Sequence, residues 1–301
     1  MLDERRSPTQ GSLTVAVPTR LDATHDDDVY LARMASAADD KARLLELADT
    51  SGLVVDVGCA DGGLLRAART AGICDAVGIE PVASLVARCH EADLDVRQGF
   101  ASQVHEIVGE GAASAVVASS VLHEVFSYGN EVPAVGRLES VDEALASFER
   151  ALRPGGTLVV RDGVMPDGHD VPEVVTVADD ADVERFLAHS PFIDPRGDRV
   201  VRLERIGERT WVGDRSSVME LALTLNWGPV SFEREVAEWY GVHTLAAYPW
   251  VAARHGFELV SARAYTQEGY RAGVAAYVSF TSGWFPCTNA VWVYRRVSSG
   301  S

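Results

Sequence analysis

The stretch LVVDVGCADGGLLR, from Leu53 to Arg66, constrains the fold of this chain more than any other. It begins as an apolar, β-branched run without polar alternation, which is typical of a buried parallel strand. Asp56 closes this run, glycines follow at positions 58, 62 and 63, and a helical pattern starts at Leu64. Glycine has no Cβ, so the backbone can turn sharply there and come close to a ligand. The stretch therefore predicts a strand, a tight turn and a helix whose first N–H groups face a ligand.

Two classes of ligand use such a turn. Gly58, Ala60 and Gly63 nearly match the dinucleotide pattern G-x-G-x-x-G, and Glu80 follows at about the distance of a ribose-binding acid. The other class is S-adenosylmethionine (SAM), and a Gly-rich turn that binds nothing is the third interpretation. Asp56 favours SAM, because a carboxylate at the strand end would repel a pyrophosphate but attract a sulfonium and an ammonium group.

Strands alternate with helices over the first half of the chain. Short buried strands are expected at 76–80, 94–98, 115–118 and 157–160. Helices are expected between them, at 82–92, 104–108 and 141–152. This alternation predicts right-handed βαβ units and a doubly wound parallel sheet, which is an α/β fold.

The pattern changes after Gly163, where residues rich in Asp and Pro include a helix at 180–188, a hairpin at 199–212 and helices at 216–225 and 231–240. The core pattern returns with a helix at 249–255 and strands at 257–264 and 290–295. At the other end, helices at 26–38 and 39–50 follow a polar arm. We therefore expect four parts: an N-terminal arm with helices (1–50), a ligand-binding core (51–163), an inserted cap (164–240) and a C-terminal completion of the core sheet (241–297).

The overall charge excludes one class of partner. The formal net charge is −17, which opposes binding to a polyanion, so no nucleic-acid partner is expected. No apolar run is long enough to span a membrane, and the N-terminus lacks the apolar region of a secretory signal. The four cysteines form no C-x-x-C pair and show no disulfide spacing. We expect a cytoplasmic protein with reduced thiols and no membrane partner, whereas the oligomeric state stays open.

Four motifs in a fixed order, DVGCADGG, GIEP, SSVLHEV and LRPGGTLVV, resemble those of the class I SAM-dependent methyltransferases. The resemblance covers residues 50–163 well and 249–296 loosely. It implies a Rossmann-like, doubly wound sheet of seven strands, with the last two strands paired antiparallel at one edge. It also implies SAM as the cofactor.

The resemblance assigns roles to individual positions. It places Asp56 and Gly58 at the methionine end of SAM, Glu80 at the two ribose hydroxyls, and Pro81 and Phe100 beside the adenine. Phe100-Ala101 stands where the family often has an Asp, so adenine recognition is expected to rest on stacking and backbone groups. The expected cofactor-binding residues are Asp56, Gly58, Cys59, Ala60, Asp61, Glu80, Pro81, Phe100, Ala101, Ser119, Ser120 and Val121.

The residues expected to act on the acceptor are His123, Glu124 and Arg161. A neutral His suits removal of a proton from a hydroxyl, although a His at a helix start can instead be structural. Arg161 can bind a carboxylate of the acceptor or pair with Asp162. The aromatic-rich last quarter of the chain lines a small-molecule pocket or fills a core, and the substrate residues expected there are Asn226, Trp227, Tyr240 and Trp284.

No metal site is expected from the spacing of the histidines at 169, 243 and 255, and the acidic run 26–28 is interpreted as a solvated helix start. The sequence thus predicts a methyltransferase acting on a small-molecule acceptor of secondary metabolism. Two alternatives stay open. One is attack at another carbon of SAM, by aminocarboxypropyl transfer or by cyclisation with release of methylthioadenosine. The other is a SAM-binding protein without catalysis. Asp56 and LRPGG disfavour a nicotinamide oxidoreductase.

Overall fold

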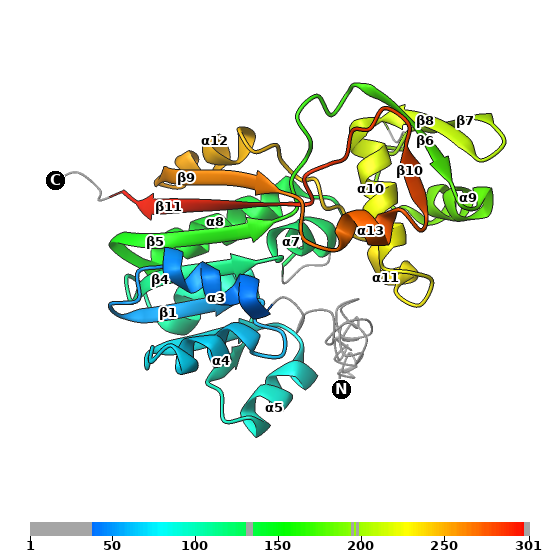
Figure 1. Ribbon diagram of the computed structural model, residues 1–301. Helices are drawn as coiled ribbons and strands as arrows, with labels where there is room; N and C mark the ends of the chain where they lie inside the picture. Colours follow the sequence, from blue (N-terminus) through cyan, green and yellow to red (C-terminus); the bar gives the residue numbers. More distant parts are fainter. Residues whose placement is uncertain (1–37, 131–134, 194–195, 197–198, 298–301) are drawn as a thin grey trace, which may run out of the picture.

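The computed structural model describes residues 38–130, 135–193, 196 and 199–297, and it is built around one mixed sheet (Figure 1). The strand order is β3-β2-β1-β4-β5-β11-β9. The strands are β1 (Leu53–Val57), β2 (Ala76–Glu80), β3 (Val96–Gln98), β4 (Ala113–Ser119), β5 (Leu152–Asp162), β9 (Phe257–Tyr265) and β11 (Asn289–Arg296). The expected arm at 1–20, the helix at 26–38 and the acidic run 26–28 lie outside or almost wholly outside the described residues.

The pairing directions confirm the expected doubly wound sheet. Strands β1 to β5 run parallel to one another, whereas β11 is antiparallel to both β5 and β9. The expected start of the fifth strand at residue 157 was too late, because β5 begins at Leu152 and includes the LRPGG segment, with a register shift against β4. In this register Ser119 lies opposite Arg161, so the ends of β4 and β5 are adjacent.

Helices cover both faces of the core sheet, which explains why its central strands carry few polar residues. On one face Leu45 and Leu64 pack with Val54, and on the other Phe148 packs with Val116. The helices of this part are α3 (Ala38–Leu47), α4 (Gly63–Thr70), α5 (Ala83–Glu91), η1 (Ala101–Gln103), α6 (Val104–Val108), α7 (Leu122–Tyr128), α8 (Leu138–Ala151) and α12 (Ala247–Arg254).

A second, antiparallel sheet of order β10-β6-β8-β7 lies beyond the carboxyl ends of β1, β4 and β5 (Figure 1). Its strands are β6 (Pro172–Val177), β7 (Leu203–Gly207), β8 (Thr210–Asp214) and β10 (Val278–Phe280). The helices around it are α9 (Asp180–His189), α10 (Arg215–Asn226), α11 (Phe232–Glu235) and α13 (Tyr270–Val274). We call residues 164–243 and 266–288 the cap.

Two expectations for the second half of the chain need correction. The segment 241–297 supplies β9 and β11 to the core sheet, but it also sends β10 into the cap, where it pairs with β6. The helix expected at 231–240 ends at Glu235. Beyond it, the Trp239 N–H donates to Ser127 Oγ and the Tyr240 N–H to the Glu220 carboxylate, so side chains replace the backbone carbonyls that a helix would use.

No helix in the described part of the chain combines the length and apolar character that crossing a membrane requires.

Candidate functional site

A pocket lies at the carboxyl ends of the parallel strands, where ligands bind in open α/β sheets. The Gly-rich turn, the ends of β2 and β4 and the start of α7 form its wall. The lining residues are Val57, Gly58, Ala60, Glu80, Pro81, Val82, Leu85, Gly99, Phe100, Ala101, Ser119, Ser120, Val121, Glu124, Val125, Gly129 and Asn130.

The turn at Gly58 accepts only a residue without a side chain. Gly58 has φ +65°, and a Cβ there would stand 2.4 Å from Cγ2 of Val121. The Gly58 N–H donates to the Ile79 carbonyl at 2.8 Å, which ties the turn to the end of β2. The turn therefore brings backbone to the edge of the pocket and packs closely against Val121 at the start of α7.

The Glu80 side chain organises the pocket floor. It is 4% exposed, and its two carboxylate oxygens accept hydrogen bonds from the Ala60 N–H at 2.9 Å and the Val82 N–H at 3.0 Å. Ala60 itself adopts φ +48°, a conformation that this bond helps to hold. Each carboxylate oxygen accepts more than one hydrogen bond, so Glu80 can hold the loop and still accept from a ligand diol.

Most of the cofactor-binding residues expected from the sequence line this pocket. They are Gly58, Ala60, Glu80, Pro81, Phe100, Ala101, Ser119, Ser120 and Val121. Phe100 and Trp227 pack around a small buried cluster that contains Val82, Leu85 and Tyr128, so Phe100 forms an apolar wall of the pocket.

Three expected residues are absent from the lining. Cys59 points under the turn, where its Sγ lies 2.6 Å from the position a Cβ would take on Gly78. Asp61 turns outward, because its carboxylate pairs with Arg66 at 2.6 Å and accepts from the Gly63 N–H. Asp56 is 3% exposed at the end of β1.

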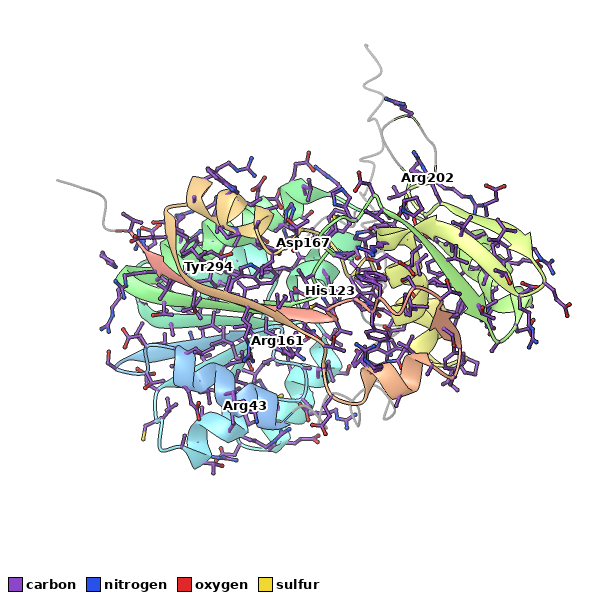
Figure 2. All side chains as sticks on the ribbon, turned by 45° about the horizontal axis from the view of Figure 1, so that its top comes forward. Arg43, His123, Arg161, Asp167, Arg202 and Tyr294 are labelled. Atoms are coloured by element: carbon purple, nitrogen blue, oxygen red, sulfur yellow. The ribbon has the colours of Figure 1, made fainter. Side chains whose placement is uncertain are left out.

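His123 lies where the core meets the cap, at the start of α7 (Figure 2). Its Nδ1 is 2.6 Å from Oδ1 of Asp162, and its backbone N–H donates to Oδ2 at 3.1 Å. Its Nε2 is 3.4 Å from Oε2 of Glu238 in the cap, and Tyr240 stacks on the ring at 5.3 Å between centroids. The sequence indicated Asp162 only as a partner for Arg161, and nothing in it pointed to Glu238.

Buried carboxyl groups surround this histidine. Burial alone would lower the pKa of His123, but the charge of Asp162 and hydrogen bonds to Asp162 and Glu238 raise it well above its usual value. Burial raises the pKa of Glu220 to about 7, and burial and the charge of Glu238 raise that of Glu235 to about 8. Arg234 pairs with Glu235 at 2.7 Å. Where core and cap meet, His123, Glu220 and Glu235 therefore keep their protons to higher pH than the same side chains would in water.

Arg161 extends from the end of β5 and is 5% exposed. Its guanidinium donates to Ser120 Oγ at 2.8 Å, to the Tyr265 hydroxyl at 3.0 Å and to Gln267 Oε1 at 2.8 Å. It borders a separate cavity of about 930 Å³ that Arg43 also lines. Arg161 thus connects the Ser120 wall of the first pocket with this second cavity.

The four expected substrate residues fall in different places. Tyr240 stacks on His123, and Trp227 packs against the same buried cluster as Phe100, but neither Tyr240 nor Trp227 lines the pocket. Asn226 ends α10 against Gly273, where a Cβ would meet its Oδ1 at 2.2 Å. Trp284 packs on Phe280 and under the Arg215 guanidinium, within the cap sheet region.

Comparison with known proteins gives a family and a fold. A family model described as a methyltransferase domain matches residues 30–262, more than half of the chain. No curated protein matches the sequence.

Three solved structures share the fold at a TM-score of 0.50. An S-adenosylmethionine-dependent methyltransferase from Mesorhizobium loti has 17% identity, with 86% of this chain and 100% of that chain covered. A SAM-dependent methyltransferase from Archaeoglobus fulgidus has 11% identity, with coverage of 89% and 100%. A chain from the complex between the Haloferax volcanii Trm112 methyltransferase activator and the putative methyltransferase has 12% identity, with coverage of 92% and 99%.

Proposed function

The chain belongs to the family of methyltransferase domains, and from this we propose that it transfers the methyl group of SAM to a small-molecule acceptor held between core and cap. It is a SAM-dependent transferase, and SAM is its cofactor. The observation that carries the proposal is the position of Glu80, whose buried carboxylate supports the Gly-rich turn and lines the same pocket as Phe100 and Ser119.

In the proposed complex Glu80 accepts hydrogen bonds from both ribose hydroxyls of SAM. Charge-assisted bonds from a diol to one carboxylate are strong and short, which suits a residue already fixed by two backbone N–H groups. Phe100 and Pro81 would flank the adenine. Gly58 and Ser119 would lie along the methionine part, with Asp56 beneath its ammonium group.

The methyl group would then point toward the junction of α7 and the cap. Methyl transfer needs the acceptor atom in line with the S–CH₃ bond: its lone pair forms the new bond to carbon while the electron pair of the old bond stays on sulfur, giving S-adenosylhomocysteine. The proton that a hydroxyl or amine acceptor carries leaves to solvent. Glu124 lines the pocket at this end. We place Glu124 beside the acceptor, with His123 and Arg161 as positioning residues behind it.

The charge of the chain supports a small acceptor rather than RNA or DNA. The net charge of −17 repels a polyanion, and buried carboxyl groups of Glu235 and Glu238 lie close to the proposed acceptor site. The cap lies beyond the carboxyl ends of β4 and β5 (Figure 1), and we propose that it closes over the acceptor. We infer a compact organic acceptor, such as an intermediate of secondary metabolism.

Two linked measurements test the proposal. Calorimetry should show one SAM bound per chain, and incubation with SAM and a panel of small hydroxyl, amine and carboxylate acceptors should yield S-adenosylhomocysteine and a product heavier by one methylene unit. Failure of SAM to bind would overturn the cofactor placement. Methylthioadenosine in place of S-adenosylhomocysteine would show chemistry at another carbon of SAM.

A further inference from the structure

Three metal-binding side chains converge at the methyl end of the proposed SAM site. His123 and Glu124 begin helix α7, and Glu238 reaches them from the cap. One donor atom from each lies within 4.8 Å of the other two, and among the residues that the structure describes this trio is the group able to hold an ion. The histidine and one carboxylate are buried, whereas Glu124 is half-buried.

The spacing of the two buried donors matches that of two ligands on one ion. Metal ligands at about 2.0–2.2 Å in a tetrahedral arrangement stand roughly 3.4 Å apart. His123 Nε2 and Glu238 Oε2 are 3.4 Å apart. Glu124 supplies the third donor from the pocket edge, with its carboxylate oxygen within 4.8 Å of the other two donor atoms.

Neighbouring groups orient both buried ligands. Asp162 Oδ1 contacts His123 Nδ1 at 2.6 Å, which places one ring proton there, so an ion would bind at Nε2 after the proton on that nitrogen leaves to solvent. The Tyr128 hydroxyl donates to Oε1 of Glu238 at 3.1 Å, so Oε2 is the oxygen that faces His123. A carboxylate behind a ligating histidine is the usual outer partner in metal sites. Asp162 and Tyr128 lie outside the trio and fix it from two sides.

The local charge favours a cation. Asp162 and Glu238 are each at most 6% exposed, and the half-buried Glu124 adds a third carboxyl group. His123 lies between Asp162 and Glu238. Buried carboxylates are costly unless cations offset them. Without an ion, a proton on Nε2 bridges to Glu238, and a divalent cation in the same place would neutralise more charge.

We propose that His123, Glu124 and Glu238 bind one divalent transition-metal ion of the Mn²⁺ or Zn²⁺ type. One imidazole and two carboxylates suit such ions, and three protein ligands leave positions open for other donors. Because Glu124 also lines the pocket, the open positions face it and would take an oxygen of the acceptor. That last role rests on the proposed function, whereas ion binding itself does not.

Manganese titration of the full chain, without SAM or acceptor, tests this. The loss of the electron paramagnetic resonance signal of free Mn²⁺ measures binding, and Mn²⁺ avoids thiols, so Cys74 and Cys287 do not contribute. We expect one ion per chain. Affinity should fall at least ~10-fold in Glu124→Gln and Glu238→Gln, and ~10- to 100-fold in Asp162→Asn, the usual range for an outer partner.

The matched control is His255→Gln. Its Nε2 also contacts a carboxylate, Asp142 Oδ1 at 2.8 Å, but Arg254 already binds that carboxylate at 2.9 Å. This variant should bind Mn²⁺ as the wild type does. The half-buried Glu124→Gln variant keeps the test decisive even where a buried substitution impairs folding, and thermal unfolding and SAM titration verify each variant.

Absence of a stoichiometric ion at submillimolar Mn²⁺, or equal binding in the wild type and Glu124→Gln, would overturn the proposal. A chain that binds Mn²⁺ in this pattern but yields no S-adenosylhomocysteine would refute the proposed function alone. A chain that transfers methyl groups but binds no Mn²⁺ would refute the metal site alone.

Discussion

His123 on α7 and Glu238 in the cap face each other with Nε2 and Oε2 3.4 Å apart, while the opposite ring nitrogen of His123 contacts Asp162. One imidazole ring thus joins the end of β5, the start of α7 and a cap segment more than a hundred residues further along the chain. The junction between core and cap therefore depends on an ionised, buried group. Both ring nitrogens of His123 have a carboxylate partner only when the cap is in place.

Removal of this ring should destabilise the protein. His123→Ala leaves the carboxylates of Asp162 and Glu238 buried without their common partner, and breaking a buried ion pair costs about 3–5 kcal/mol. We expect that loss in the free energy of unfolding by urea, with SAM affinity nearly unchanged and turnover reduced. His105→Ala is the control, because that buried ring contacts the neutral Ser147 hydroxyl at 3.0 Å and the exposed Glu106 carboxylate at 3.7 Å, so its loss leaves no buried charge without its partner. Equal losses of unfolding free energy in both variants would show that the carboxylate partners of His123 add no stability beyond that of an ordinary buried histidine.

Stability should fall as the pH rises from about 4.5 to about 7. Burial raises the pKa of Glu220 from its ordinary 4.5 to about 7. Between these values the folded chain keeps a proton on Glu220 that the unfolded chain has lost, so rising pH favours unfolding, and Glu220 alone contributes roughly 3 kcal/mol to the change. Glu220→Gln should lose less stability over this range, as measured by urea unfolding at several pH values. The exposed Glu233→Gln is the control, and a Glu220→Gln slope equal to that of the wild type would contradict the assignment.

Loss of Glu80 should weaken SAM binding. Glu80→Ala removes the charge-assisted bonds proposed for the ribose, a change of about 1.5–3 kcal/mol in binding free energy by calorimetry. The same substitution frees the N–H groups of Ala60 and Val82, so Glu80→Gln, which keeps one acceptor oxygen, should show an intermediate loss. Unchanged affinity in Glu80→Ala would mean that the ribose lies elsewhere.

The Gly58 turn offers a sharper test of where SAM lies. Gly58→Ala puts a Cβ 2.4 Å from Val121 Cγ2 and strains a residue at φ +65°, so the turn must move away from α7. We expect SAM affinity to fall more than tenfold. Gly72→Ala is a matched control, because Gly72 has φ +79° but no atom within 4 Å of the new Cβ. If both variants lose affinity equally, backbone strain alone explains the effect and the pocket placement loses its support.

The core sheet and the cofactor pocket were predictable because their determinants are local. A buried strand, a Gly-rich turn and a helix follow one another within Leu53–Arg66, and parallel pairing brings Glu80 and Ser119 to the same edge. The sequence did not indicate which side chains of the Gly-rich turn face the pocket. Cys59 and Asp61 share it with Gly58, but the turn directs their side chains away from the pocket.

The carboxyl groups around His123 were not predictable from the sequence. Glu220 is the only charged residue in the largely apolar stretch 216–225, and Glu235 and Glu238 occur in a segment that also carries the charged residues Glu233 and Arg234. Their burial depends on packing between α10, the segment after α11 and α7, which no local pattern specifies. The expectation of no metal site rested on histidine spacing along the chain, whereas the candidate ligands come together only in the folded cap.

The measurement that most directly separates methyl transfer from chemistry at another carbon of SAM is incubation of the purified protein with SAM alone, followed by mass spectrometry of the small molecules. We expect SAM to bind and to be recovered intact, because no acceptor is present and the sulfonium is held for attack at its methyl carbon. Methylthioadenosine formed at a catalytic rate would contradict it and would assign the chain to chemistry at another carbon of SAM.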